Sequence, residues 1–529
     1  MFDRRTLESA VRSEGGISRR LMLSYAGALA ALPILGLRAE GRTVRKPRFD
    51  SDPFTVGVAS GDPTDTGVVL WTRLAPRPLE PGGGMPEEKV AVAWELADDE
   101  AMTNIVRRGE ALATPQLGHS VHVEVDGLKP GRWYYYRFQA GDAASPVGRT
   151  RTAPEASSTP DTLKFAFASC QHYEAGHFTA YEHMLKDQLD LVVHLGDYIY
   201  EGPGRDNGVR KHQGAEIESL NDYRIRHAQY KTDKHLAAMH AACPWVVTWD
   251  DHEVDNNYAA EINEKDGVEP IDFLLRRANA YQAYYEMMPL RRDSLPQGPN
   301  LQLYRTVKFG RLAEFQVLDT RQYRSDQPNG DKRSPLNDAA LDRKNSLLGA
   351  KQADWLASRL LDSGGTWNIL AQQVMMGMVG FPSPGEPQYS MDQWPGAAAE
   401  RIRLVKFLAD RKIPNPVVLT GDIHCNWAND LRVDDRKVDE PVVAAEFVGT
   451  SISSGSDGSD TRKGSDLMLA ANPGIRFFNA QRGYVRCNVT PTEWRTDYQV
   501  LDQVTKPGGV ASTRASFRLE AGKPGLSPA

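Results

Sequence analysis

The chain of 529 residues lacks the features that mark several common protein classes. Its formal charge of −6 leaves no basic excess for binding nucleic acid. Its four cysteines form no C-x-x-C pair and no zinc-finger spacing, so a disulfide scaffold is not expected, although two disulfides are permitted in an oxidising compartment. The G-x-S-x-G elbow of serine hydrolases is also missing. These absences point away from nucleic-acid binding, small disulfide-rich folds and serine-nucleophile chemistry.

Hydrophobic runs long enough to span a bilayer, which takes about 20 apolar residues, are also absent. The longest candidate, Ala26 to Leu37, follows Ser18-Arg19-Arg20 and precedes a possible processing site at Ala39. Adjacent arginines before an Ala-rich apolar segment are typical of a twin-arginine export signal. We therefore predict that residues 1–40 direct the protein through the twin-arginine translocation machinery and are removed, leaving no membrane span. The alternative is an amphipathic N-terminal helix with a chance arginine pair.

The composition is that of an ordinary globular protein, with 40% apolar and 25% charged residues. A length of 529 residues exceeds what one core usually supports, so we expect two domains. Residues 41–52 are basic and polar, which predicts a linker. Residues 53–150 hold short β-branched or aromatic runs separated by turns, such as 68–71, 90–94 and 133–138. Their spacing predicts a small β-sandwich domain of immunoglobulin or fibronectin type.

The pattern changes after a Pro/Ser/Thr-rich boundary at residues 152–161. Over residues 160–505, apolar strand-like runs alternate with amphipathic helical stretches, which predicts an α/β domain. The expected strands are 164–169, 191–195, 245–249, 314–318, 367–370 and 417–420. The expected helices include 178–188, 273–288 and 398–411. Residues 506–529 are rich in Gly, Pro and Ser, and we expect a tail that is poorly ordered at its end.

Residues able to bind metal directly follow four of the expected strands. The strand ends are Cys170; Asp197 with Tyr198 and Tyr200; Asp250-Asp251-His252-Glu253 with Asp255-Asn256-Asn257; and Asp422-Ile423-His424. In open α/β sheets, the loops at the carboxyl ends of strands converge on one crevice. Carboxylates, imidazoles, a thiolate and a phenolate gathered there would repel one another or stay unpaired unless cations neutralised them.

Each strand end has a simpler explanation when it is taken alone. Asp197 fits a helix cap or turn, and adjacent Asp250 and Asp251 fit a solvated turn. Cys170 alone is more often a buried small hydrophobic residue than a ligand. The Asp-x-His pair at 422–424 places both side chains on one face of an extended segment, which also occurs by chance. Four such strand ends in one domain favour a metal site over these separate explanations.

Several long motifs resemble the PhoD-like alkaline phosphatase family. They are Gly-Asp-Tyr-Ile-Tyr-Glu (196–201), Trp-Asp-Asp-His-Glu-Val-Asp-Asn-Asn (249–257), Thr-Gly-Asp-Ile-His (420–424), Leu-Asp-Thr-Arg-Gln-Tyr-Arg (318–324) and Phe-Val-Gly-Thr-Ser-Ile-Ser (447–453). The resemblance runs in the family's order from about Phe54 to about Val500. It implies an α/β fold, namely a four-layer α/β/β/α metallophosphatase sandwich behind a small β-domain. It also implies hydrolysis of phosphate mono- and diesters with one Fe³⁺ and two Ca²⁺ ions.

The resemblance also assigns metal ligands at the matching positions. The ligands of the iron and its neighbours become Cys170, Asp197, Tyr200, Asp422 and His424. The ligands of the adjacent calcium ions become Asp251 and Asn257, with Asp197 bridging. Which of Asp250 and Asp251, and which of Asn256 and Asn257, points inward stays open. Carboxylate, phenolate and amide oxygens suit calcium and ferric iron, whereas the thiolate is an unusual, strongly donating ligand.

Two catalytic residues follow from the same resemblance. His252 occupies the position where related metallophosphatases keep a histidine close to the substrate oxygen. Arg321 is expected to clamp phosphate, with Arg324 as the other candidate and surface pairing as the alternative role. A metal-activated hydroxide or oxide would attack phosphorus without a covalent phospho-enzyme, while clustered cations neutralise the equatorial oxygens.

The function expected from these residues is that of an exported phosphoesterase, periplasmic or secreted. Its substrate would be a small-molecule, lipid or nucleotide phosphoester, with no specific binding of nucleic acid. One alternative is a phospholipase D-like phosphodiesterase on the same fold. Another is a non-catalytic exported metal-binding or adhesion protein, which would not need the cysteine, carboxylate and histidine ligands together. The oligomeric state is not predicted.

Overall fold

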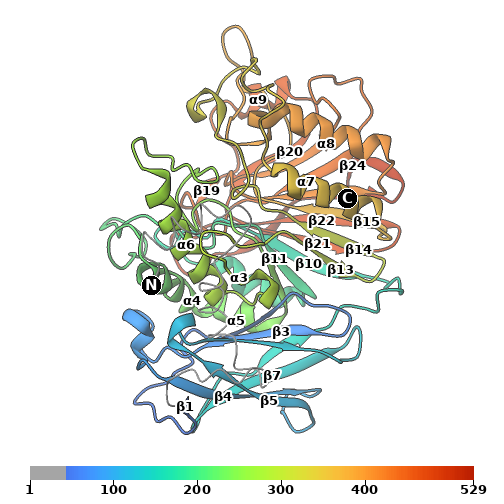
Figure 1. Ribbon diagram of the computed structural model, residues 1–529. Coiled ribbons are helices and arrows are strands. Elements are labelled where there is room, and N and C mark those ends of the chain that lie inside the picture. Colours follow the sequence, from blue (N-terminus) through green and yellow to red (C-terminus); the bar gives the residue numbers. More distant parts are fainter. Residues whose placement is uncertain (1–42) are drawn as a thin grey trace.

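The computed structural model describes residues 43–529, so the expected signal segment at residues 1–40 lies outside the described part. Over these residues the chain forms three sheets, of which the first comes from the N-terminal region (blue to cyan in Figure 1). Its strands are β1 (Thr43–Val44), β4 (Lys89–Ala97), β5 (Ile105–Ala113), β7 (Trp133–Ala140), β8 (Ala143–Ala144) and β9 (Gly148–Arg151). The segment 41–52, expected as a linker, thus contains the edge strand β1, which pairs with β4 in parallel.

The N-terminal region continues directly into the sheet that follows it. Strands β2 (Val58–Gly61), β3 (Val68–Arg73) and β6 (Ser120–Val125) pack on the first sheet through a core that includes Leu70, Val92 and Phe138. They also extend the second sheet, because Gly61 pairs with Trp245. A Cβ atom at Gly61 would lie 2.8 Å from the Trp245 carbonyl oxygen, so this junction requires glycine. The β-sandwich expected at 53–150 therefore shares a sheet with the α/β region.

The second sheet has ten strands in the order β24-β23-β22-β21-β10-β11-β12-β2-β3-β6. Its parallel centre consists of β10 (Leu163–Ala168), β11 (Leu191–His194) and β12 (Trp245–Val247). Its antiparallel side consists of β21 (Gly483–Val489), β22 (Glu493–Leu501), β23 (Ala511–Glu520) and β24 (Lys523–Pro528).

The last two strands of that sheet differ from the expected tail at residues 506–529. Gly, Pro and Ser residues favoured a poorly ordered segment, but Phe517 and Leu519 alternate with polar residues and are buried in the core between the sheets. Strand β24 lies at the sheet edge, where Pro524 and Gly525 are tolerated because one side of the strand needs no partner. Burial of the apolar face of β23 therefore outweighs the weak strand propensity of this region.

The third sheet has eight strands in the order β13-β14-β15-β16-β18-β17-β20-β19. They are β13 (Arg305–Phe309), β14 (Ala313–Val317), β15 (Trp367–Ala371), β16 (Pro416–Thr420), β17 (Asn426–Leu431), β18 (Ala444–Val448), β19 (Gly458–Ser459) and β20 (Ile475–Gln481). Strands β14, β15, β16 and β18 are mutually parallel. The mixed sheets and the intervening helices confirm the α/β class predicted from the alternating pattern.

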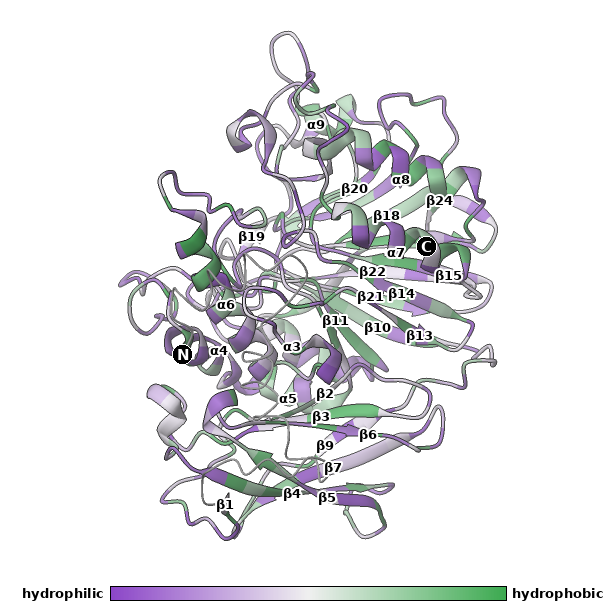
Figure 2. Cartoon of the chain, in the orientation of Figure 1, coloured by the Kyte–Doolittle hydropathy of each residue, from purple (hydrophilic) through white to green (hydrophobic). Residues whose placement is uncertain are grey.

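The second and third sheets pack face to face through side chains that alternate along each strand. Phe165 of β10 meets Phe315 of β14 at a ring distance of 5.3 Å and Trp494 of β22 at 5.6 Å. The alternate residue of β10, Ala166, belongs to the core on the opposite face, which is why these strands read as continuous apolar runs. Figure 2 shows the apolar colouring along β10 and β11.

Helices cover the outer faces of both sheets. The outer face of the second sheet packs against α3 (Thr179–Met184), α4 (Leu220–Lys231), α5 (Lys234–Ala242) and α6 (Pro270–Met287). The outer face of the third sheet packs against α7 (Gly349–Leu361) and α8 (Ala398–Asp410), while α9 (Ser465–Ala471) contacts β20. Within the described part of the chain, no helix combines the length and apolarity needed to cross a membrane.

Candidate metal centre

The strand ends named from the sequence meet where the two large sheets adjoin. Cys170 and Asp197 follow β10 and β11 of the second sheet, and Asp422 follows β16 of the third. The sheets touch at Ser169, which forms an isolated bridge with Ser451. A Cβ atom at Gly421 would lie 2.6 Å from the Ser169 hydroxyl, so glycine permits this approach. The carboxyl ends of strands from two sheets therefore share one site.

Left-handed backbone marks the residues of this site. Non-glycine residues with positive φ are uncommon, cost about 1–2 kcal/mol each and cluster at functional sites. The expected ligands with positive φ are Cys170 (58°), Asp197 (53°), Asn257 (48°), Asp422 (63°) and His424 (52°). Such conformations persist only where the surrounding fold stabilises them, so the fold holds these residues in place.

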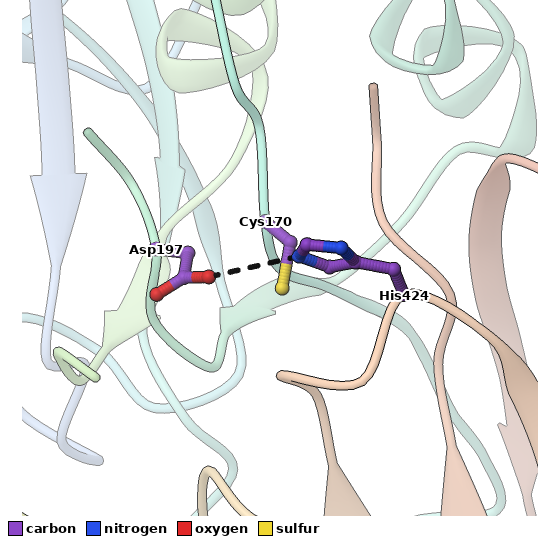
Figure 3. A group of neighbouring side chains, drawn as sticks. All are labelled: Cys170, Asp197 and His424. Carbon is purple, nitrogen blue, oxygen red and sulfur yellow. Dashed lines mark ion pairs between the residues drawn. The ribbon is translucent and has the colours of Figure 1, made fainter. Parts of the chain in front are cut away.

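The first group of ligand atoms is formed by Cys170, Asp197 and His424, which lie within 4.8 Å of one another. Figure 3 shows the three side chains pointing toward a common space, with a His424 nitrogen 4.0 Å from an Asp197 oxygen. The Tyr200 hydroxyl donates to Asp197 at 2.8 Å and lies 3.2 Å from His424 Nε2. Tyr198 points elsewhere, since its hydroxyl lies 2.7 Å from His240 Nε2.

The second group is formed by Asp250, Asp251 and Asp422, again within 4.8 Å. Both adjacent aspartates are buried and face this cluster, so the structure does not select one of them. A third group contains Asp197, Asp251 and His252; it shares Asp197 with the first group and Asp251 with the second, and so links them.

The two asparagines beyond these aspartates differ in direction. The Asn257 backbone N–H donates to Asp251 at 2.8 Å, and its side-chain amide donates to Asp331 at 2.5 Å. The Asn256 amide donates to Glu264 in an exposed contact of 2.8 Å. Asn257 is therefore tied to the cluster, whereas the Asn256 side chain turns away from it.

Burial and mutual repulsion dominate the electrostatics of the carboxylates. Burial, reinforced by Asp251, raises the pKa of Asp197 to about 7, although His252 opposes this shift. Burial and the neighbouring Asp392 raise the pKa of Asp422 to about 8. Asp197 Oδ1 and Asp250 Oδ2 are buried without a hydrogen-bond partner. Buried carboxylate oxygens without donors are what bound cations would satisfy, so the residues present fit a multi-metal site.

Arg321 lies inside this network rather than at the surface. Its side chain is fully buried, and it donates to Asp250 at 2.5 Å and to Asp392 at 2.7 Å. One of its terminal nitrogens lies 3.8 Å from both Asp251 and Asp422. Arg324 donates to the same Asp392 at 3.0 Å. The surface pairing considered for both arginines is thus not what the structure contains.

Two glutamates inside the sequence motifs were assigned no role from the sequence, although they stand beside predicted site residues. Glu201 accepts from His252 Nδ1 at 2.7 Å, which orients the imidazole. Glu253 accepts from the backbone N–H groups of Asp197 at 3.1 Å and of Asp250 at 2.9 Å, so it joins two ligand loops. Their signal was their position inside the acidic motifs 196–201 and 249–257.

Two further residues were not predicted from the sequence. The Gln393 amide donates to the Asp422 carboxylate, and the Ser454 hydroxyl donates to the Tyr200 hydroxyl at 2.7 Å. Each comes from a segment far from the motif that it contacts. Gln393 lies in the loop after β15, beside the Asp422 loop of the same sheet, whereas Ser454, after β18 of the third sheet, reaches Tyr200 of the second.

A cluster of carboxylate, thiol, phenol and imidazole groups at the strand ends of an α/β fold is typical of metal-dependent hydrolases. The chain matches the PhoD-like phosphatase family over residues 165–498 and the N-terminal domain of PhoD-like phosphatases over residues 39–154. It therefore belongs to the PhoD-like phosphatase family and is a hydrolase acting on phosphoric ester bonds.

Two relatives support this assignment over nearly the whole chain. The chain is 52% identical to alkaline phosphatase D of Bacillus subtilis (strain 168), over 99% of this chain and 89% of that protein. It also superposes on a solved structure described as "Structure of PhoD" with a TM-score of 0.89 and 54% identity, covering 91% of this chain and 93% of the other. The resemblance inferred from the motifs is thus confirmed.

Proposed function

We propose that this protein is an exported phosphoesterase that hydrolyses phosphate mono- and diesters at an iron–calcium centre. The observation that carries the proposal is the position of Asp197, which belongs both to the group with Cys170 and His424 and to the group with Asp251 and His252. A carboxylate shared by two ligand groups would suit a pair of adjacent cations. The similarity to alkaline phosphatase D supports phosphomonoesters as one substrate class.

The donor chemistry supports a division of the site between two kinds of cation. Cys170, Tyr200 and His424 offer sulfur, phenol oxygen and nitrogen around Asp197, a mixed set that suits ferric iron. Asp250, Asp251 and Asp422 offer only oxygen, with Asn257 at the edge, which suits calcium. When bound, such cations supply Lewis acidity toward the phosphoryl oxygens and lower the pKa of coordinated water.

We assign proton transfer to His252. Glu201 accepts from its Nδ1–H group and thereby leaves Nε2 as the atom available to the substrate. Burial disfavours the charged imidazole, but Glu201, Asp251 and Asp197 together raise the pKa of His252. A protonated Nε2 would donate to the leaving oxygen as the ester bond breaks.

For Arg321, the buried position supports a role in charge balance as well as the expected phosphate clamp. Its guanidinium fixes Asp250, and one terminal nitrogen lies 3.8 Å from Asp251 and from Asp422. It therefore offsets the repulsion among these carboxylates. Its nearness to both clusters also supports contact with a phosphate held between them.

The succession of helices, two facing sheets and further helices supports a four-layer α/β/β/α metallophosphatase sandwich. The immunoglobulin- or fibronectin-like character of the N-terminal sandwich stays a prediction. Export by the twin-arginine pathway, to the periplasm or outside the cell, rests on the sequence of residues 18–39.

The test is release of nitrophenol from nitrophenyl phosphate and from bis-nitrophenyl phosphate, before and after chelation. We expect turnover of both substrates, loss on chelation and recovery on adding calcium with ferric iron. Turnover of the diester alone would favour the phospholipase D-like alternative. Absence of turnover in protein with its full metal content would contradict the proposal.

A further inference from the structure

We propose that His172, Glu174 and His212 form an additional site for a divalent transition metal of the zinc type. Their ligand atoms lie within 4.8 Å of one another, and none of the three residues belongs to the groups around Asp197 or Asp250. Glu174 is 3% and His212 is 1% exposed. His172 and Glu174 lie in the loop after β10, whereas His212 lies in the long segment between β11 and α4.

The first observation behind this site is a pair of buried atoms without partners. His172 Nδ1 and Glu174 Oε2 are both buried and accept or donate no hydrogen bond. The other carboxylate oxygen, Oε1, accepts from the backbone N–H groups of Arg205 at 2.6 Å and of His212 at 3.0 Å. The carboxylate is therefore held in a fixed orientation, with Oε2 aimed at the histidines. Buried polar atoms of this kind normally have a partner, and a cation supplies one.

The second observation is the separation between His212 Nδ1 and Glu174 Oε2. At 3.6 Å it is too long for a hydrogen bond. It is close to the roughly 3.3 Å that separates two ligand atoms around a tetrahedral ion with bonds of about 2.0 Å. The geometry therefore leaves room for an ion between the imidazole and the carboxylate.

The surroundings of His212 provide the support that a metal-bound histidine needs. Its Nε2 lies 3.0 Å from the Tyr230 hydroxyl, so an Nε2–H group can donate there while Nδ1 keeps its lone pair. Metal-bound histidines commonly donate their second ring N–H to an oxygen in this way. The opposite tautomer would donate from Nδ1 to the Gly202 carbonyl oxygen at 3.2 Å and would close the site. Metal binding at Nδ1 therefore requires the tautomer that carries its proton on Nε2.

The donor set decides the class of ion. Two imidazoles and one carboxylate are the ligands of many zinc sites, whereas calcium prefers oxygen alone. Arg205 is the competitor in this site, because its Nε lies 3.9 Å from Glu174 Oε2. Its side chain is 65% exposed and is free to turn into solvent when an ion enters.

An ion at this position would stabilise two of the loops that form the candidate metal centre. It would join the loop that follows Cys170 to the segment that follows Tyr200. The His172 ring packs edge-on against the Tyr200 ring at 4.4 Å. The expected role is thus to stabilise loops that carry the catalytic ligands, without contact with substrate.

The experiment saturates the metal-loaded full chain with zinc or cobalt, removes unbound ions and counts the metals retained per chain. We expect wild type to retain one more equivalent than Glu174→Gln or His212→Asn, with iron content unchanged. Tetrahedral cobalt absorbs strongly in the visible range, and this absorption should be lost in the same two variants. Arg205→Ala should bind zinc more tightly than wild type, because it removes the competing cation.

The control removes a histidine–carboxylate pair elsewhere, Glu182→Gln with His235→Asn, whose side chains lie 3.9 Å apart nearer the surface. It should retain the extra equivalent, as should Asp422→Asn, which alters only the candidate centre. Equal retention by wild type and the Glu174 and His212 variants would overturn the proposal. If the Glu174 and His212 variants fail to fold, wild type and Asp422→Asn decide. If neither of these two proteins retains zinc in addition to the metals of the candidate centre, the proposal is overturned.

Discussion

The Tyr200 hydroxyl donates a 2.8 Å hydrogen bond to Asp197 Oδ2. Tyr198, two residues earlier, turns its hydroxyl to His240 Nε2 at 2.7 Å instead. Of these two tyrosines, Tyr200 is therefore the one placed where a phenolate could bind the proposed iron. A phenolate or thiolate on ferric iron gives charge-transfer absorption in the visible range, so concentrated protein should be purple or reddish.

The visible spectrum of two tyrosine variants tests this assignment. Tyr200→Phe should weaken or shift the band, because it removes the oxygen donor and keeps the ring. Tyr198→Phe is the matched control and should keep the colour. Loss of colour in Tyr198→Phe with colour retained in Tyr200→Phe would transfer the ligand role to Tyr198.

The carboxylates of Asp197 and Asp422 should be indispensable for turnover. Each belongs to a buried ligand group, so Asp197→Ala or Asp422→Ala removes a donor and unbalances the charge of the cluster. We expect each variant to retain less than about a tenth of the wild-type rate, which corresponds to roughly 1.4 kcal/mol of barrier. Asp439→Ala, at an exposed position, is the control. A higher residual rate in steady-state assays would remove that residue from the proposed centre.

Glu253 should position the centre without touching substrate. It accepts from the backbone N–H groups of Asp197, Tyr198 and Asp250. Because a hydrogen bond contributes about 0.5–1.5 kcal/mol and a buried N–H group left without its acceptor costs about 1–3 kcal/mol, Glu253→Ala should lower the free energy of unfolding by at least about 2 kcal/mol. Glu253→Gln keeps one acceptor oxygen and should lose less stability.

The kinetic effect of both Glu253 variants should fall on kcat. Displaced ligand loops reduce transition-state stabilisation more than substrate binding, so KM should change little. Denaturant unfolding and steady-state kinetics measure the two effects. Glu253→Ala with unchanged stability and unchanged kcat would show that the three hydrogen bonds do not hold the loops.

His194 should make the fold sensitive to acid. It is fully buried, and burial together with nearby Lys231 lowers its pKa to about 3. The unfolded chain has an ordinary histidine pKa near 6.5, so it binds the proton first as pH falls. The stability contributed by neutral His194 is therefore complete above pH ~6.5 and is lost progressively toward pH ~3.

Replacement of His194 by a ring that does not titrate isolates this effect. Between pH 7 and pH 5, His194 should lower the free energy of unfolding of wild type by about 2 kcal/mol. His194→Phe keeps a ring beside Trp245, and its free energy of unfolding should fall by that much less over the same pH range. Denaturant unfolding at both pH values measures it. The same pH dependence in both proteins would contradict the assignment.

The arginine pair at residues 19–20 should direct export. Arg19→Lys with Arg20→Lys should leave folded, active enzyme inside the cell, because the twin-arginine machinery reads the pair. Arg4→Lys with Arg5→Lys is a matched control, since that pair does not adjoin the apolar run. Phosphatase activity in separated cell fractions measures the outcome. Unchanged export of the first variant would contradict the twin-arginine signal.

The sequence by itself determined which residues stand at the ends of the parallel strands. Continuous apolar runs such as 191–195 and 417–420 predicted β11 and β16 because both faces of these strands are buried. The polar residues directly after them, Asp197 and Asp422, then had to lie at one end of a sheet. These signals are local, since strand period and strand termination depend on neighbouring residues.

Only the tertiary structure decided which distant residues complete the site. Glu201 meets His252 because the loops after β11 and β12 of the second sheet fold together, and Gln393 meets Asp422 because the loops after β15 and β16 of the third sheet do the same. The tail pattern likewise could not reveal β23, whose Phe517 becomes apolar core only once β22 lies beside it. Local propensity does not encode the register between strands far apart in the chain. That register is set by the burial of both sheets against each other, which exists only in the folded molecule.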